Sequence, residues 1–219
     1  MVAGVAGRAS GYGWVVIILV RHGETQANRA GAYLGRADPP LTERGRRQAE
    51  RVAAMLPPPD RVITSPLQRA QETASFIDGR AEIDARWIEL DYGPLDLTPV
   101  GALPEMTMHR WRYDPDFAPE GVETFRTLAA RVHSACEELC PLAESSVVVI
   151  VTHVSPVKAA VCWALGGELS LGGRMFVDDG GIARIDVADG RPTLRWFNRV
   201  GDQPGERAEE AHGRAAPGG

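Results

Sequence analysis

The sequence of 219 residues contains few cysteines, almost no lysine and no hydrophobic run long enough to span a bilayer. Its three cysteines form no C-x-x-C pair, which argues against a disulfide framework or a zinc knuckle and favours a reducing, cytoplasmic location. The apolar run at 14–20 is too short for a membrane span, and no small-residue cleavage motif follows it. These absences disfavour a secreted or membrane-spanning protein.

Lysine is represented by Lys158 alone, so arginine supplies the rest of the 24 basic residues. The formal net charge of −5 argues against a nucleic-acid partner, which needs an extended positive face. Most of the arginines fit a compositional bias. Arginine also binds phosphate and carboxylate better than lysine does, because its planar guanidinium can donate two parallel hydrogen bonds. Lys158 itself is expected on the exposed face of a helix, and the alternative is that it reaches the rim of a binding pocket.

The length and composition fit one soluble domain. Hydrophobic residues make up 44% of the chain and charged residues 24%, as in ordinary globular proteins. We expect a folded domain over 14–202, a flexible leader over 1–13 and a disordered tail over 203–219, which is rich in Gly, Pro, Ala and charge without periodicity. A monomer or a homodimer is expected.

Predicted strands alternate with predicted helices along the chain. This alternation predicts an α/β fold, namely a three-layer α/β/α sandwich with a mostly parallel central sheet and an irregular insertion near 91–121. The insertion is expected to hold one short helix at 105–112, and residues 80–90 read as extended. The other expected strands are 14–20, 61–64, 146–152, 181–187 and 193–197, and the other expected helices are 41–56, 66–77, 122–140 and 155–165.

Arginines and histidines follow several of these strands. Arg21 and His22 follow the first strand, Arg69 lies shortly after the second, and His153 follows the strand at 146–152. Ligands of open α/β sheets bind beyond the carboxyl ends of the strands, so we expect these side chains to meet there. Gly23 is expected to leave room for backbone amides to approach a ligand.

The residue types suit phosphoryl transfer. Arginine forks match the oxygens of a phosphate dianion, and a neutral His22 offers a lone pair for attack on phosphorus, which would give a phosphohistidine. The arginines can neutralise the phosphate, and the H-E-x-x-H, Walker and aspartate-rich phosphatase patterns are absent from the sequence. No metal and no cofactor are therefore expected.

The segment Leu19–Thr25, with the sequence LVRHGET, resembles the signature of the histidine phosphatase superfamily, also called phosphoglycerate mutase-like. A lone Arg-His-Gly would be weak evidence, but several further blocks follow in the family's order between about 17 and 200. These blocks are Asn28, GRAD at 35–38, PLTERG at 40–45, TSPLQRAQETA at 64–74, GVETF at 121–125 and VTHV at 151–154.

The resemblance implies a role for each matching residue. His22 would be the phosphorylated nucleophile, and Glu89 would protonate the leaving group and then activate water. The phosphate pocket would consist of Arg21, Arg69 and His153, with Asn28 six residues past the nucleophile helping to hold the phosphoryl group. Gly35 and Arg36 are further candidates for substrate binding, and Asp91 and Asp96 are rival acids.

Two local features bear on the activity within that family. After the acid, many relatives continue Gly-x-Trp-Glu-Gly, whereas this chain has GPLDL at 93–97, so its substrate specificity is open. The run THVSPVK at 152–158 favours the phosphatase branch. The leading hypothesis is a metal-independent, acid-type histidine phosphatase acting on a small phosphorylated metabolite. The alternatives are a phosphoglycerate mutase and, from another class, a catalytically inactive phosphate-binding domain.

Overall fold

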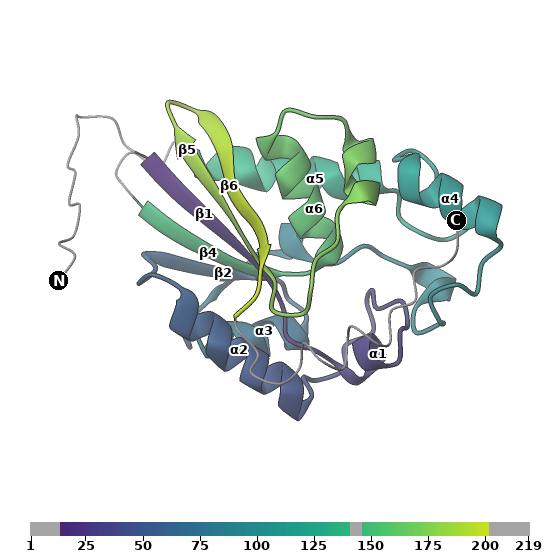
Figure 1. Ribbon diagram of the computed structural model, residues 1–219, viewed down its shortest axis with the longest axis horizontal. Helices are drawn as coiled ribbons and strands as arrows, with labels where there is room; N and C mark the ends of the chain where they lie inside the picture. The colour runs from purple at the N-terminus through teal and green to yellow at the C-terminus, as the bar shows by residue number, and fades with distance from the viewer. Residues whose placement is uncertain (1–13, 141–145, 202–219) are drawn as a thin grey trace.

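A computed structural model describes residues 14–140 and 146–201. The predicted leader at 1–13 and tail at 203–219 lie outside the described residues. The described chain forms one six-stranded sheet with helices on both sides (Figure 1). The strands are β1 (Trp14–Arg21), β2 (Arg61–Thr64), β3 (Glu82–Ile83), β4 (Ser146–Thr152), β5 (Ile182–Ala188) and β6 (Arg191–Arg199).

The sheet is mixed, in the order β3-β2-β4-β1-β5-β6. Strands β1, β4, β2 and β3 run parallel to one another, while β5 pairs antiparallel with β1 and with β6. The β5–β6 hairpin turns at Asp189 and Gly190, both of which have positive φ, as a two-residue primed turn requires. The predicted α/β sandwich with a mostly parallel sheet is therefore confirmed.

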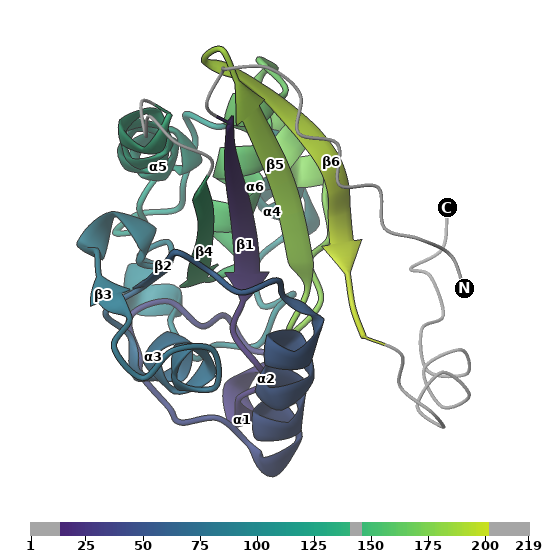
Figure 2. The ribbon, with the colours of Figure 1, turned by 90° about the vertical axis from the view of Figure 1, so that its left-hand side faces the viewer.

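Two helices cover each face of the sheet. Helices α5 (Phe125–Leu139) and α6 (Val154–Ala164) lie on one face, and α2 (Glu43–Met55) and α3 (Gln68–Ser75) lie on the other (Figures 1 and 2). Strand β1 supplies both layers because its side chains alternate. Its residues 15, 17 and 19 join the cluster under α5 and α6, and residues 16, 18 and 20 join the cluster over α2 and α3.

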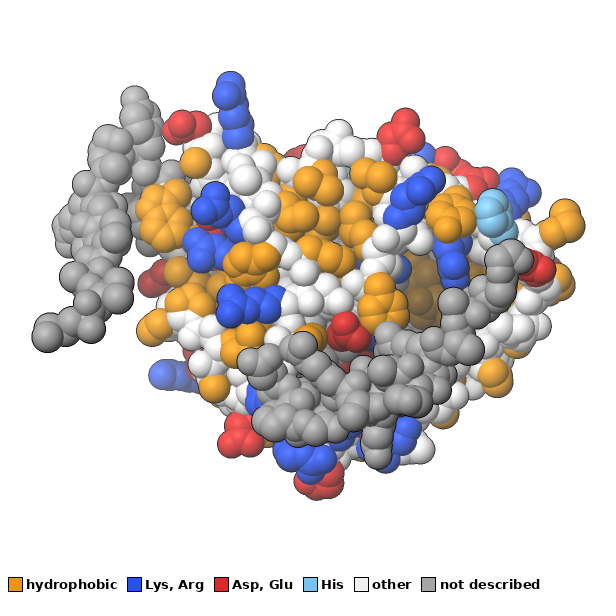
Figure 3. All heavy atoms as spheres, in the orientation of Figure 1, with side chains coloured by type: hydrophobic (Ala, Val, Ile, Leu, Met, Phe, Trp, Pro, Cys, Tyr) orange, Lys and Arg blue, Asp and Glu red, His pale blue; other side chains and the backbone are white. Residues whose placement is uncertain are grey.

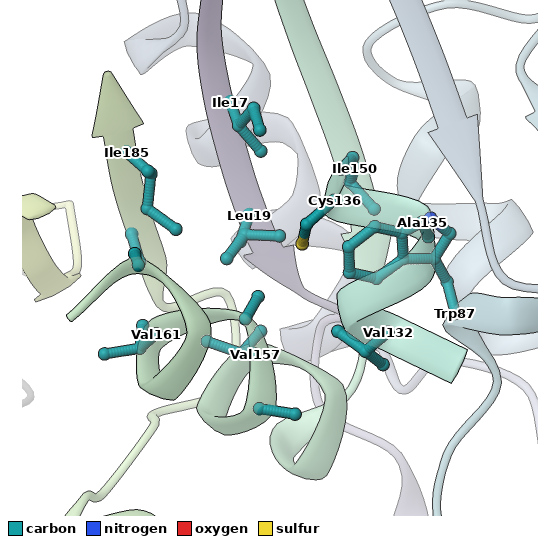
Figure 4. Packing of buried hydrophobic residues seen from close by; sticks show 14 of the residues in the cluster. Ile17, Leu19, Trp87, Val132, Ala135, Cys136, Ile150, Val157, Val161 and Ile185 are labelled. Carbon is teal, nitrogen blue, oxygen red and sulfur yellow. The ribbon is translucent and has the colours of Figure 1, made fainter. Parts of the chain in front are cut away.

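The larger of the two core clusters lies between the sheet and α5 and α6. Trp87, at the end of the 3-10 helix η1 (Ala85–Trp87), is fully buried there beside Val132 and Ala135 of α5 (Figure 4). Thr152 Oγ1 donates to the Trp87 carbonyl, 2.5 Å away. This packing fixes residues 87–89 against the end of β4.

Helix boundaries follow their capping residues. Thr42 caps α2 by accepting a hydrogen bond from the Gly45 amide. Thr124 caps α5 in the same way through Thr127, so this helix begins at Phe125 and not at 122 as predicted. Helix α6 begins at Val154, directly after His153.

The remaining differences from the sequence prediction are short elements. The segment 80–90 is extended only at β3, because η1 interrupts it. The four-residue helix α1 (Gln26–Arg29) was not predicted, since one turn is too short to show periodicity. The insertion contains the expected helix as α4 (Glu105–Tyr113), together with the 3-10 helix η2 (Gly93–Leu95), and a further 3-10 helix, η3 (Leu169–Arg174), follows α6. No helix within 14–140 and 146–201 has both the length and the apolar character needed to cross a membrane.

We expect Leu128→Ala to lower the free energy of unfolding by about 2–5 kcal/mol, because Leu128 of α5 is fully buried and its removal leaves a cavity. Urea denaturation followed by circular dichroism measures this change. Met106→Ala, at an exposed position on α4, is the control and should change the free energy by less than about 0.5 kcal/mol. Equal effects of the two substitutions would contradict the assigned core.

Candidate active site

Two histidines meet at the carboxyl ends of β1 and β4. In the parallel pairing of these strands, Arg21 lies opposite Thr152, and the His22 amide donates to the Thr152 carbonyl over 2.9 Å. The next residues, His22 and His153, therefore lie side by side, with ring centroids 5.1 Å apart. Their exposed fractions are only 3% and 0%.

The hydrogen bonds of His22 fix its tautomer. Its Nδ1 lies 2.7 Å from the Gly23 carbonyl, and its Nε2 lies 3.2 Å from Nε of Arg69. A guanidinium can only donate, so Nε2 accepts and Nδ1 carries the proton. Burial first, and then the nearby Arg69 and Arg21, lower the pKa of His22 well below its usual value. His22 is therefore neutral, with its lone pair on Nε2.

Arg69 comes from α3 and is completely buried. Its guanidinium donates to the carbonyls of Ala37 and Gly35 at 2.7 and 2.8 Å, and Asp38 lies 3.6 Å away. Burial lowers the pKa of Arg69 to about 10, so the group remains charged at neutral pH. The loop at 34–38 thus holds a cation against His22.

Arg21 is held by the segment that precedes β5. Its Nη1 donates to the Val177 carbonyl, and its Nη2 lies 2.5 Å from Oδ1 of Asp179. Burial raises the pKa of Asp179, and the charge of Arg21 opposes this rise. The Nε of Arg21 is buried and has no hydrogen-bond partner among the described residues.

His153 is held by Ser65, which follows β2. Its Nε2 lies 2.7 Å from Ser65 Oγ, while its Nδ1 is buried without a partner among the described residues. Burial, followed by the charge of Arg69 and the neighbouring His22, lowers the pKa of His153 well below its usual value. Ser65 was not among the predicted site residues, although its place at a strand end was a usable signal.

Glu89 is buried at the N-terminal end of α6. Its Oε1 accepts from the amides of Leu90 and Ser155 at 2.7 and 3.2 Å, whereas its Oε2 reaches only the Ser155 amide, at 3.4 Å. Arg131 of α5 binds the carbonyls of Ile88 and Glu89 and so fixes this segment. The carboxyl is therefore held by Oε1, and Oε2 is the less engaged oxygen.

The two rival acids have other partners. Asp96 accepts from the amides of Gly35 and Ala37 at 2.8 and 2.7 Å, so both of its oxygens hold the loop that binds Arg69. Asp91 accepts from the Gly93 amide, and its side chain is 48% exposed. Of the three acids, Glu89 is the buried one, whereas both Glu89 and Asp96 raise the pKa of Arg69.

Three further predicted residues have contacts within the protein. Asn28 Oδ1 accepts from the amide and hydroxyl of Thr25, which closes the cap of α1. Gly35 contributes its carbonyl to Arg69. The Arg36 guanidinium lies 3.6 Å from Asp91 and 3.8 Å from Glu123, among carboxylates of the insertion and its boundary.

Gly23 has a packing role that the sequence did not predict, and its expected role beside a ligand stays a prediction. Its amide donates to Thr73 Oγ1, so it is already engaged within the protein. The position needs glycine because a Cβ there would come within 2.3 Å of the Gly45 carbonyl of α2.

A cavity of about 190 Å³ adjoins Glu89. Leu90 and Ser155, whose amides bind the Glu89 carboxyl, are part of its lining, and Tyr33, Tyr92 and Trp111 are in mutual ring contact in its wall. Figure 3 shows a hollow beside α4 with hydrophobic side chains in it and basic side chains near its edge. Lys158 is half-buried and lines this cavity, so its predicted exposed position is wrong.

Within 14–140 and 146–201, no three His, Cys, Asp or Glu side chains are grouped so that they could hold a metal ion. The charged groups that act on the pKa of His22 are Arg69 and Arg21.

Residues 17–200 match the model of the histidine phosphatase superfamily (branch 1), so the chain belongs to this family. It is 32% identical over 212 residues to phosphoserine phosphatase 1 of Hydrogenobacter thermophilus, an alignment that covers 90% of this chain and 98% of that protein. It is 34% identical to a protein of Cronobacter sakazakii named "Probable phosphoglycerate mutase GpmB", over 78% of this chain and 84% of that one.

Among solved structures, the alpha-ribazole phosphatase of Shigella flexneri superposes with a TM-score of 0.74 at 29% identity, covering 86% of this chain and 99% of that one. The chain also spans about half, 54%, of the length of a longer protein of Mycobacterium tuberculosis named a bifunctional protein, to which it is 31% identical over 84% of its own length. The fold and family expected from the sequence are confirmed.

Acid should destabilise the folded chain through the two site histidines. Both have lowered pKa values, so below about pH 6.5 the unfolded chain binds protons that the folded chain does not, and the free energy of unfolding falls with falling pH. Each histidine contributes a slope of up to about 1.4 kcal/mol per pH unit. Urea titrations between about pH 7 and pH 5 should therefore show that the free energy of unfolding depends less steeply on pH in His153→Asn than in the wild type.

His109→Asn, on the exposed side of α4, is the matched control and should keep the pH dependence of the wild type. Equal pH dependence in the wild type and His153→Asn would refute the buried, neutral state of His153.

Proposed function

We propose that this chain is a phosphomonoesterase that hydrolyses a small phosphorylated metabolite through a phosphohistidine on His22. The observation that carries the proposal is a pair of buried nitrogens without hydrogen-bond partners among the described residues, Arg21 Nε and His153 Nδ1, next to a neutral histidine whose lone pair is on Nε2. We infer that Nδ1 of His153 carries the proton and that Nε2 accepts from Ser65 Oγ. Buried polar groups are almost always hydrogen-bonded. A bound phosphate dianion would supply the missing acceptors.

In the first half-reaction, His22 Nε2 attacks phosphorus in line with the ester oxygen. The N–P bond forms, the P–O bond breaks, and the leaving oxygen takes a proton from Glu89. Arg21, Arg69 and His153 donate to the phosphoryl oxygens, on which charge is spread in the transition state. The bond from Nδ1 of His22 to the Gly23 carbonyl keeps the ring oriented and its proton on the far nitrogen.

In the second half-reaction, the Glu89 carboxylate takes a proton from water as the water oxygen attacks the phosphohistidine. The O–P bond forms, the N–P bond breaks, and inorganic phosphate leaves with His22 neutral again. Oε2 of Glu89 is the oxygen suited to this proton transfer, because Oε1 is occupied by two amides. Glu89 thus serves as acid and then as base.

Two guanidinium groups support a reaction without a metal. Arg21 and Arg69 can both donate to a dianionic phosphate monoester, and Asp179 and Asp38 offset part of their charge. We expect turnover to persist after dialysis against EDTA. A loss of activity that Mg²⁺ or Zn²⁺ restores would contradict this part of the proposal.

A second candidate function is that of a phosphoglycerate mutase, which the similarity to the Cronobacter protein favours. In a mutase the phosphohistidine would return its phosphoryl group to a bound acid instead of to water. Incubation with 3-phosphoglycerate separates the two functions. A phosphatase releases inorganic phosphate, and rapid formation of 2-phosphoglycerate with little phosphate release would favour the mutase.

We expect His22→Ala to abolish turnover, with a loss of more than about 10⁴-fold in kcat, because the nucleophile is removed. Acid quenching of the wild type during turnover of a ³²P-labelled ester should trap an acid-labile phosphoryl group, and the variant should trap none. His133→Ala, on α5 and facing the Ala159 carbonyl, is the matched control and should label as the wild type does. A wild type that neither labels nor releases phosphate would favour an inactive phosphate-binding domain.

Glu89→Gln tests the proton transfer. Its cost in kcat should be about 10²–10⁴-fold on an alkyl phosphate, because the leaving oxygen then receives no proton. On p-nitrophenyl phosphate, whose leaving group needs no proton, the variant should release a burst of one p-nitrophenol per site and then hydrolyse its phosphohistidine slowly. Asp91→Asn should hydrolyse both esters as the wild type does. A burst of p-nitrophenol from Asp91→Asn, and none from Glu89→Gln, would assign the acid role to Asp91.

A further inference from the structure

Lys158 and Arg112 are two cations without a carboxylate partner on the cavity beside Glu89. Neither forms an ion pair or a side-chain hydrogen bond within the described residues, and the described residues that line the cavity include no Asp or Glu. Many other arginines of the described chain are paired with carboxylates; Arg86, for example, contacts both Asp84 and Glu138. The wall of the cavity therefore carries a local positive charge.

Lys158 is the more buried of the two cations. Burial lowers its pKa, while the carboxylate of Glu89 acts in the opposite direction. An ammonium loses hydration when it is buried, and an anion that binds it offsets this cost. Its position in the cavity wall therefore favours an anionic occupant of the cavity.

The place of Lys158 on α6 relates it to the reaction. It follows Ser155 by three residues, which is one helical turn, so the two side chains project from the same side of the helix. The Ser155 amide holds the Glu89 carboxyl, and both residues line the cavity. A leaving group that receives its proton from Glu89 would extend into the space that Lys158 faces.

We propose that the leaving group of the substrate carries a carboxylate, which Lys158 binds from the helix side of the cavity and Arg112 from the exposed side. This inference rests on the proposed phosphatase function, because the proton transfer from Glu89 in that function sets the direction in which the leaving group lies. The aromatic wall and the volume of about 190 Å³ suit a short carbon chain between the phosphate and the carboxylate. Cationic leaving groups such as choline would be repelled.

The test compares two pairs of esters on the wild type, Lys158→Met and Lys158→Arg. The first pair is 3-phosphoglycerate and glycerol 3-phosphate, and the second is O-phosphoserine and O-phosphoethanolamine. In each pair the first ester carries a carboxylate and the second lacks it. The wild type should favour the carboxylate in kcat/KM by about 10- to 100-fold, the range expected for one charged hydrogen bond. Lys158→Met should lose most of this ratio through a higher KM, and Lys158→Arg should recover part of it.

Arg47→Met, at an exposed position on α2, removes one cation away from the cavity and should keep the wild-type ratio. A third pair, fructose 1,6-bisphosphate and fructose 6-phosphate, tests for a second phosphate in place of the carboxylate. A wild-type preference for the bisphosphate that Lys158→Met abolishes would overturn the carboxylate assignment. An unchanged carboxylate ratio in Lys158→Met would overturn the role of Lys158.

The carboxylate preference and the phosphatase function are tested by different outcomes. If the wild type hydrolyses p-nitrophenyl phosphate and forms the acid-labile label but does not prefer either carboxylate ester, the inference about Lys158 fails and the phosphatase function stands. If the wild type neither forms the label nor releases phosphate from any of these esters, the proposed function itself fails.

Discussion

The parallel pairing of β1 with β4 is the constraint on which the candidate site depends. This register ends with Arg21 opposite Thr152, so the next residue of each strand is a histidine and the two rings lie 5.1 Å apart. A register shift of one residue would turn one of them to the other face of the sheet. The two hydrophobic layers prevent such a shift, because alternate β1 side chains pack into different clusters.

Around the histidines, the fold buries cations and compensates each of them differently. Arg69 is held by backbone carbonyls of the 34–38 loop, and Asp96 in turn holds the amides of that loop. Arg21 is held by Val177 and Asp179, from the segment before β5. Because β5 is antiparallel to β1, its beginning lies at the same edge of the sheet as the end of β1. Two positive groups are thus fixed in place by the fold, which is the preorganisation that the proposed phosphoryl transfer requires.

Much of this arrangement could be predicted from local sequence. Apolar runs that end in Arg21-His22 and in Thr152-His153 identified both histidines, and the ordered motifs identified the family. Ser65 and Asp179 were missed because their partners lie 88 and 158 residues away in the chain, and no local pattern encodes such contacts. Lys158 was placed on an exposed helix face because periodicity alone does not reveal that α4 and η3 build a cavity over that face.

By itself, the sequence determined the alternation of strands and helices, the family, and the residues delivered by the ends of β1 and β4, because these depend on hydrophobic periodicity and short motifs. Only the tertiary structure decided which nitrogen of His22 carries the proton, that the oxygens of Asp96 hold a loop while Glu89 is buried, and that Lys158 faces a cavity without acidic residues in its lining. The physical reason is that protonation, burial and charge pairing depend on distances between groups far apart in the chain, which are fixed only when the layers pack.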